Sequence, residues 1–240
     1  MPDNQSKQAV RDRAWAALRE AGAARFPGVE GRIPNFVGAE AAAGRLAALP
    51  EWAAARAIKV NPDSPQLAVR KRALQDGKTL YMAVPKLASE RPFWMLDPDE
   101  LTVPAHRAAS IKGATEHGRP VALDELERID LIVCGSVAAE RGGARLGKGG
   151  GYADLEFAIA TEAGLVGPWT TIVTTVHPSQ VLDDDTIPVT DHDFPLDVIV
   201  LPDDEIRTST SLPRPTGVVP HHLDAEKRAA IPVLARARRT

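Results

Sequence analysis

Short apolar segments, separated by stretches with a helical pattern, constrain the fold of this chain more than any other feature. The clearest is Leu131-Ile132-Val133-Cys134, whose continuous apolar character is typical of a strand buried on both faces of a sheet. The other β-rich segments are 57–60, 79–84, 171–176 and 198–201. Strands that alternate with helices predict an α/β fold with a mostly parallel sheet covered by helices on both faces.

The helical pattern is strongest near the N-terminus. Val10, Ala14 and Leu18 recur at helical spacing and predict a helix over residues 6–24, with Ser6 as its N-cap. Phe26-Pro27-Gly28 is expected to end it. Further helices are expected over 39–49, over 63–75 with Asp63 as the cap, and over 155–164.

Two regions give a weaker pattern. Residues 87–128 contain well-separated prolines and are expected to form loops around one short helix. The chain from Thr208 is rich in proline and ends in basic residues, which predicts an extended tail. We therefore expect an α/β domain over 1–207 and a proline-rich, basic extension over 208–240. The basic residues at its end are Arg236, Arg238 and Arg239.

Composition narrows the range of functions. The 29 Lys and Arg residues are outnumbered by 32 Asp and Glu, and the pI near 6.1 argues against a nucleic-acid partner. The polar N-terminus does not resemble a signal peptide, and no apolar run is long enough to span a bilayer. The single Cys134 excludes an intramolecular disulfide, as is typical of a reducing compartment. We expect a cytoplasmic protein with no membrane partner; the sequence does not indicate an oligomeric state.

The segment Arg145-Leu146-Gly147-Lys148-Gly149-Gly150-Gly151-Tyr152, called here the glycine loop, is the most informative motif. It follows a buried strand and leads into a helix, so its amides can approach a phosphate while the helix N-terminus adds partial positive charge. Arg145 can bind phosphate oxygens bidentately, and Lys148 adds a mobile charge. The loop has neither the Gly-Lys-Ser/Thr end of a Walker A motif nor the third glycine of a dinucleotide fingerprint. Glycine clusters also occur in plain surface turns; the two cations and the flanking elements favour a site for the phosphates of ATP.

Residues 145–154 resemble the signature R-L-G-x-G-G-G-Y-Y-D-R of the 5-formyltetrahydrofolate cyclo-ligase family. The similarity covers most of the chain, from Lys7 to about Leu201. Lys7 and Arg11 match the family's N-terminal phosphate-binding helix, although Lys and Arg are also common on solvated helix faces. The other matches are Gly77-Lys78, Pro85, Gln180, Pro188, His192-Asp193 and Asp197.

The resemblance implies a three-layer α/β/α fold with a mostly parallel sheet, of the NagB/RpiA/CoA-transferase type. It also implies an ATP- and Mg²⁺-dependent ligase that converts 5-formyltetrahydrofolate into 5,10-methenyltetrahydrofolate. In that reaction a phosphoryl group is transferred to the formyl oxygen, which becomes a leaving group, and attack by N10 closes the ring. Such chemistry depends mainly on positioning and on stabilising charge.

Individual roles follow from the same resemblance. Arg145 and Lys148 would be catalytic and stabilise the transferred group, and Asp154 and Asp193 would hold Mg²⁺, which prefers oxygen ligands. Asp63 stands where the family has a Glu that contacts folate, and Tyr152 would also contact the substrate. The residues expected to bind ATP are Lys7, Arg11, Arg145, Gly147, Lys148, Gly149, Gly150, Gly151 and Tyr152.

The chain departs from the signature at two positions, where Ala153 replaces a Tyr and Leu155 replaces an Arg. Glu140 also stands where the family usually has Asp. These features, with the segment 32–36, are similar to a divergent branch, the methenyltetrahydrofolate synthetase domain-containing proteins. They leave open an alternative function, a non-catalytic or regulatory nucleotide-binding module that has kept the fold and lost folate specificity.

Two other constellations carry weaker hypotheses. His177, Asp191, His192 and Asp193 have the side chains of a transition-metal site, but no metal-binding spacing supports one. A hydrogen-bonded structural role is the simpler interpretation of His177. Phe93-Trp94 has the residue types to stack on a pterin ring or to anchor a loop.

Overall fold

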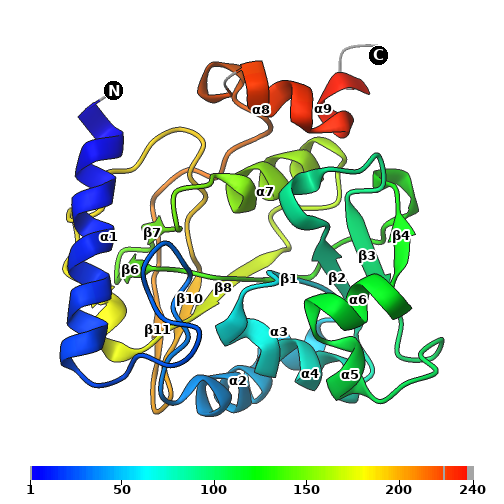
Figure 1. Cartoon of the computed structure of the whole chain (residues 1–240), viewed down its shortest axis with the longest axis horizontal. Coiled ribbons are helices and arrows are strands. Elements are labelled where there is room, and N and C mark those ends of the chain that lie inside the picture. The colour runs from blue at the N-terminus through cyan, green and yellow to red at the C-terminus, as the bar shows by residue number, and fades with distance from the viewer. Residues whose placement is uncertain (1, 224, 237–240) are drawn as a thin grey trace.

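A mixed sheet of eight strands forms the centre of the described part of the chain, residues 2–223 and 225–236 of the computed structural model (Figure 1). The strand order is β11-β10-β8-β5-β1-β2-β3-β4. Its strands are β1 (Ala57–Val60), β2 (Thr79–Ala83), β3 (Phe93–Leu96), β4 (Arg119–Val121), β5 (Leu131–Cys134), β8 (Thr171–Thr175), β10 (Val198–Val200) and β11 (Glu205–Arg207).

The five inner strands, from β10 to β2, run parallel, whereas β11, β3 and β4 join the two edges in antiparallel fashion. The parallel strands are those that the apolar segments predict. This confirms the expected α/β class with a mostly parallel sheet.

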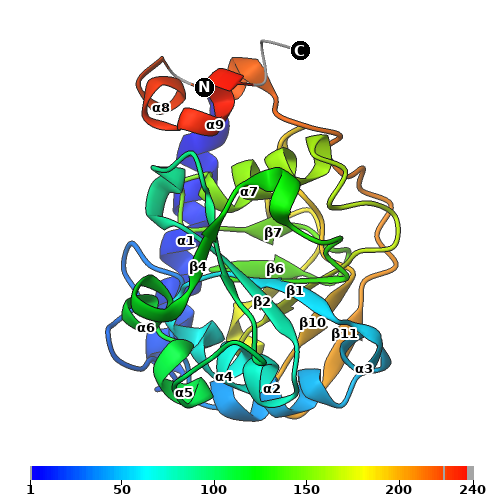
Figure 2. The same ribbon diagram turned by 90° about the vertical axis from the view of Figure 1, so that its right-hand side faces the viewer.

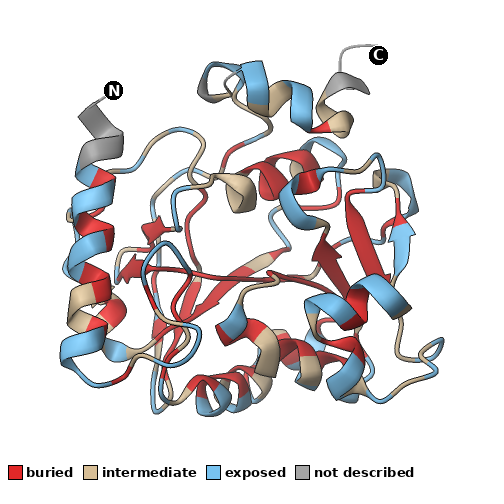
Figure 3. Ribbon diagram, in the orientation of Figure 1, coloured by how far each residue is buried: buried red, intermediate tan, exposed pale blue. Residues whose placement is uncertain are grey.

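Side chains along each central strand alternate between two separate hydrophobic cores. Leu131 and Val133 of β5 pack in one core, and Ile132 and Cys134 pack in the other. Adjacent residues in a strand point to opposite faces, so a strand buried on both sides is apolar throughout. Figure 3 shows the buried strands between helices whose outer surfaces are exposed.

Helices cover both faces and make the three layers that the resemblance implies. The helices α2, α4, α5 and α6 pack on one face, α1 extends that core to the side, and α7 covers the other face (Figures 1 and 2). Their bounds are α1 (Pro2–Glu20), α2 (Ala39–Ala47), α3 (Pro50–Ala54), α4 (Leu67–Gln75), α5 (Ala105–Ala108), α6 (Ile111–His117) and α7 (Tyr152–Glu162). The 3₁₀ turns are η1 (Ser64–Gln66), η2 (Pro85–Leu87), η3 (Leu123–Glu125), η4 (Pro178–Gln180) and η5 (Pro220–His222).

Between β5 and the glycine loop, the chain forms two strands of a second, small sheet. It contains β6 (Ala138–Glu140), β7 (Arg145–Leu146) and β9 (Val181–Leu182) in the order β7-β6-β9. The strand directly before the glycines is therefore β7, in this small sheet, and the helix directly after them is α7, as predicted.

Several local predictions are wrong. Residues 87–128 form β3, α5, α6, β4 and η3 rather than loops around one helix. Phe93 and Trp94 are buried in strand β3 and do not line the cavity described below, so they cannot stack on a ligand there. The expected helix over 39–49 is interrupted, because α2 ends at Ala47 and Pro50 begins α3. Asp63 precedes η1, but its side chain makes no capping hydrogen bond.

The expectation of an extended tail is also wrong. Residues 225–236 form α8 (Ala225–Ala230) and α9 (Pro232–Arg236), and Ile231 between them is buried in the core beside α7. Arg238 and Arg239 lie outside the described residues. Within the described chain, none of the helices combines the length and the apolar character that crossing a bilayer requires.

Candidate functional site

A cavity of about 660 Å³ opens where β1 and β2 end and the glycine loop begins. The residues after β1, Asn61 to Asp63, and those after β2, Val84 to Lys86, line it together with Gly147, Lys148 and the segment from Gly150 to Tyr152. Open α/β sheets bind ligands outside the carboxyl ends of their strands, and a cavity of this volume suits an organic molecule of drug size or larger. The expected site residues Asp63, Arg145, Lys148, Tyr152 and Asp154 all line it.

Two glycines of the loop have left-handed backbone conformations, which side chains rarely tolerate. Gly149 has φ 99°, and a Cβ placed on it would lie 3.4 Å from Cζ of Arg11. Gly151 has φ 65° and is the N-cap of α7. The loop therefore needs glycine at both positions to make its turn and to let Arg11 approach the backbone.

The structure brings helix α1 onto the glycine loop, as the resemblance implies. Arg11 is buried, and its Nε donates a hydrogen bond to the carbonyl oxygen of Gly147 at 2.8 Å. Burial lowers the pKa of Arg11, and the negative charge of Asp193 opposes this effect. Lys148 reaches back across the cavity, where its Nζ contacts Oδ1 of Asp63 at 2.8 Å. Arg11 thus reaches the loop from the N-terminal helix, whereas Lys148 belongs to the loop and reaches away from it to Asp63.

Arg145 holds the base of the loop. Its side chain is 3% exposed, its Nη2 binds Oδ1 of Asp154 at 2.8 Å, and its Nη1 donates to the carbonyl of Gly135 at 3.0 Å. The guanidinium also lies 4.3 Å from the ring centroid of Phe194. Burial disfavours the charged form, but attraction to Asp154 and Asp193 outweighs it and raises the pKa of Arg145. Arg145 is therefore a fixed positive charge at the cavity wall.

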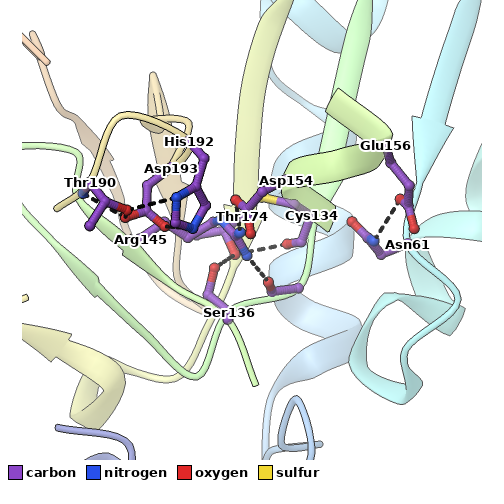
Figure 4. Close-up of polar contacts among 12 residues, drawn as sticks. Asn61, Cys134, Ser136, Arg145, Asp154, Glu156, Thr174, Thr190, His192 and Asp193 are labelled. Atoms are coloured by element: carbon purple, nitrogen blue, oxygen red, sulfur yellow. Dashed lines mark hydrogen bonds and ion pairs between the residues drawn. The ribbon is translucent and has the colours of Figure 1, made fainter. Parts of the chain in front are cut away.

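Asp193 joins the same network from the loop before β10. Lys7 of α1 binds its Oδ2 at 2.5 Å, and the backbone N–H and hydroxyl of Thr190 donate to the same oxygen at 2.8 and 2.7 Å. Burial alone would raise the pKa of Asp193, but the hydrogen bond and charge of Lys7 lower it overall. Figure 4 shows Asp193 and Asp154 near Arg145, with the pair Asn61 and Glu156 to one side.

The two carboxylates expected to hold Mg²⁺ are each paired with a cation, Asp154 with Arg145 and Asp193 with Lys7. Among the described residues, no three His, Cys, Asp or Glu side chains gather as a metal site. This argues against the transition-metal hypothesis for the region of His177, whose side chain instead accepts from the N–H of Ser179. Mg²⁺ commonly binds one or two carboxylates plus substrate phosphates. Asp154 lines the cavity and fits a metal that arrives with a nucleotide, whereas Asp193 is not one of the lining residues.

Several buried polar residues at the cavity or beneath it were not predicted from the sequence. Lys59 and Glu156 form a buried ion pair, and Asn61 donates to the same carboxylate at 3.3 Å. Arg70 is buried, binds the carbonyls of Asn61 and Asp63, and has its pKa lowered to about 10 by burial. The charge of Lys59 within an otherwise apolar strand was the one signal that could have identified this group.

The two departures from the family signature have different surroundings. Ala153 lines the cavity, so the phenol that the signature places here is missing from the cavity wall. Leu155 packs in the core beneath α7 and is not part of the cavity lining. Only the first substitution changes the surface that a ligand would touch.

Comparisons with known proteins show the family that the chain is similar to. The sequence profile of the 5-formyltetrahydrofolate cyclo-ligase family matches residues 3–202. The chain is 41% identical over 235 residues to the mouse methenyltetrahydrofolate synthase domain-containing protein, and the alignment covers 97% of this chain and 63% of that protein. The zebrafish relative is 35% identical over 236 residues, covering 98% and 62%. The chain thus spans about three fifths of the length of these relatives.

Among solved structures, the NMR structure of Aquifex aeolicus 5,10-methenyltetrahydrofolate synthetase has a similar fold, with a TM-score of 0.54 and 19% sequence identity. The superposition covers 91% of this chain and 99% of the Aquifex chain. The likeness supports the α/β fold described above.

Proposed function

This chain belongs to the 5-formyltetrahydrofolate cyclo-ligase family, and from this premise we propose that it uses Mg-ATP to convert 5-formyltetrahydrofolate into 5,10-methenyltetrahydrofolate. The observation that carries the proposal is the meeting of Arg11, Arg145 and Lys148 at the glycine loop, beside a cavity of about 660 Å³. A cytoplasmic location is proposed with it, because the single free Cys134 is typical of a reducing compartment.

Each of the three cations would contribute differently. Arg145 is fixed by Asp154 and would hold phosphate oxygens in one geometry, whereas the Lys148 side chain is 46% exposed and can move with the transferred group. Arg11 secures the loop carbonyl of Gly147, so that the neighbouring amides keep their orientation. Preorganised charge of this kind lowers a phosphoryl-transfer barrier because it needs no rearrangement during the reaction.

In the proposed reaction the formyl oxygen attacks the γ-phosphorus and ADP leaves. The N10 nitrogen of the folate then attacks the activated formyl carbon, its proton is lost, and the phosphorylated oxygen departs as inorganic phosphate. Asp63, which holds Lys148 in the structure, would exchange this partner for the substrate when Lys148 turns to phosphate. Mg²⁺ would be held by Asp154 and Asp193 and would neutralise phosphate charge.

Two polar atoms support a ligand at this place. Nε of Arg145 and Oδ1 of Asn61 are buried without a hydrogen-bond partner among the described residues, and both residues line the cavity. Buried polar groups are rarely left unpaired, so a molecule with a matching acceptor and donor would stabilise the site.

The second candidate is a nucleotide-binding module without folate turnover. Ala153 favours it, because a cavity wall that lacks the signature phenol offers less surface for stacking on a pterin. Under this alternative the cations still bind ATP, and the folate side of the cavity has lost its specificity.

One assay separates the candidates. Purified protein is mixed with Mg-ATP and 5-formyltetrahydrofolate, and the near-ultraviolet absorbance of the methenyl product is followed. We expect product to form only when both ATP and Mg²⁺ are present. ATP binding by calorimetry without product would establish the second candidate, and absence of both would reject the nucleotide site.

A further inference from the structure

The C-terminal segment, residues 208–236, lies beyond the part of the chain that the family profile matches, which ends at residue 202. It nevertheless follows α7 along its length. Arg214 binds Asp197 at 2.6 Å, and the N–H of Val218 donates to Glu162 in the last turn of α7. Figures 1 and 2 both show α8 and α9 above α7, at the side away from α2 and α4.

This path brings Lys227 of α8 to the glycine loop at the other end of α7. Its Nζ donates to the carbonyl oxygen of Gly150 at 2.5 Å and lies 4.9 Å from the ring centroid of Tyr152. A Cβ placed on Gly151 would lie 3.1 Å from the same Nζ. A side chain at position 151 would therefore press on this ammonium.

The surroundings of Lys227 suit a polyanion. Lys227 stands at the N-terminus of α7, where the helix has partial positive charge, Arg11 contacts the same loop, and Arg145 and Lys148 belong to it. A polyphosphate in the loop would be attracted by Lys227 and by the helix end together.

We propose that Lys227 is a positioning residue for the polyphosphate site, through which the C-terminal segment fixes the glycine loop. The inference rests on the proposed nucleotide site and extends it beyond the residues that the family signature contains. By holding the Gly150 carbonyl away from the bound phosphates, Lys227 keeps the neighbouring amides directed toward them. Its charge adds attraction for the polyanion over the same short range.

The test uses the full chain and three variants. Lys227→Met keeps the aliphatic stem and removes the charge, Lys227→Arg keeps the charge, and Arg228→Met removes a neighbouring cation that donates to the carbonyl of Pro220 instead of the loop. Dissociation constants for Mg-ATP and for inorganic tripolyphosphate are measured by calorimetry, and thermal unfolding is recorded for each protein. We expect Lys227→Met to weaken both ligands by about tenfold, as the loss of a charge-assisted hydrogen bond would. Lys227→Arg should recover most of the affinity, and Arg228→Met should bind like the wild type.

The outcomes separate this inference from the proposed function. Equal affinity of Lys227→Met and the wild type overturns the inference and leaves the proposed function standing. A lower melting temperature for Lys227→Met with unchanged affinity also overturns it, since the role would be structural only. If the wild type binds tripolyphosphate but not Mg-ATP, the proposed function fails and the tripolyphosphate series still decides the role of Lys227. Binding of neither ligand by the wild type overturns both.

Discussion

The guanidinium of Arg145 is almost completely buried, and its charged form is stabilised there by the ion pair with Asp154. Breaking a buried ion pair from one side leaves the other charge without compensation, which commonly costs several kcal/mol. Lys148 and Asp63 form a looser pair, because the lysine is nearly half exposed. The two pairs therefore respond differently to substitution, and each gives a separate prediction.

Lys148→Ala should weaken Mg-ATP binding by about tenfold with little change in stability, since an exposed ion pair contributes about 1 kcal/mol or less to folding. Calorimetry measures the affinity and urea unfolding measures the stability. The matched control is Lys112→Ala, which removes an 84% exposed lysine paired with Glu116 on α6. Unchanged affinity in the Lys148 variant would count against the role of the loop as a phosphate site.

Asp154→Asn should lower the proposed Mg²⁺-dependent turnover by about 10- to 100-fold, because the carboxylate proposed to hold the metal is replaced by an amide. The fold should persist, although the free energy of unfolding should fall by about 2 kcal/mol. The amide oxygen of the variant can still accept a hydrogen bond from Arg145, but the negative charge of the carboxylate is lost. Turnover is measured over a Mg²⁺ titration. Asp12→Asn, which changes an exposed residue bonded to Gln8, is the control. Equal turnover of the Asp154 variant and the wild type at each Mg²⁺ concentration would reject Asp154 as a ligand.

At the scale of elements, α1 is held to the site by two basic residues on its buried face. Lys7 and Arg11 lie one turn apart; the first binds Asp193 in the loop before β10, and the second binds the glycine loop. Val10, Ala14 and Leu18 lie on the same side of α1 and are buried in the core. The helix thus connects two loops that would otherwise be independent.

The stabilising effect of the ion pair between Lys7 and Asp193 should decrease at low pH. The pKa of Asp193 is lowered in the folded chain, so its ion pair contributes stability above the unfolded-state pKa of about 3.9 and loses it as the pH falls through the lower, folded value. Lys7→Met should therefore be less stable than the wild type at neutral pH, and the difference should shrink below about pH 4. Urea unfolding at several pH values measures it. Lys112→Met is the control, and a difference that stays constant with pH would contradict the assignment.

Elements that bury a continuous apolar run were predictable, and those that depend on their neighbours were not. All four residues from Leu131 to Cys134 are apolar, so both faces of this segment must be buried. Strand β5 could therefore be predicted directly from the sequence. Strand β4 contains Arg119 and Pro120, both exposed, because it is an edge strand completed by pairing with β3. Its residues carry no apolar pattern of their own, and the tertiary contact alone makes it a strand.

At the scale of the whole molecule, the site lies where the two cores and the small sheet meet. The glycine loop and its cations could be recognised in the sequence, because the motif consists of residues that follow one another directly in the chain. It did not reveal which carboxylate pairs with which cation, since Asp63 and Lys148 are 85 positions apart in the chain. Nor did it place Lys227 on the loop, because that contact depends on how the C-terminal segment folds back over α7.

We propose that the domain extends over 1–207 and that the chain from 208 onward is an extension docked on it. Ile231 is 1% exposed and anchors this extension in the core beside α7. Ile231→Ala should lower the free energy of unfolding by about 2 kcal/mol and the melting temperature by about 4–8 °C. Because the mutation loosens α8 and α9, trypsin should cut after Lys227 or Arg228 much faster than in the wild type.

The control for this prediction is Ile111→Ala, which truncates an isoleucine that is 45% exposed and should change neither quantity. Thermal unfolding of the Ile231 variant should remain a single cooperative transition, since the sheet and both of its helical layers keep their contacts. Faster cleavage at Lys227 or Arg228 with cooperative unfolding is the behaviour of a docked extension. Unchanged cleavage at Lys227 and Arg228, with only a lower melting temperature, would mean that the last residues unfold together with the rest of the chain, and the boundary at residue 207 would be wrong.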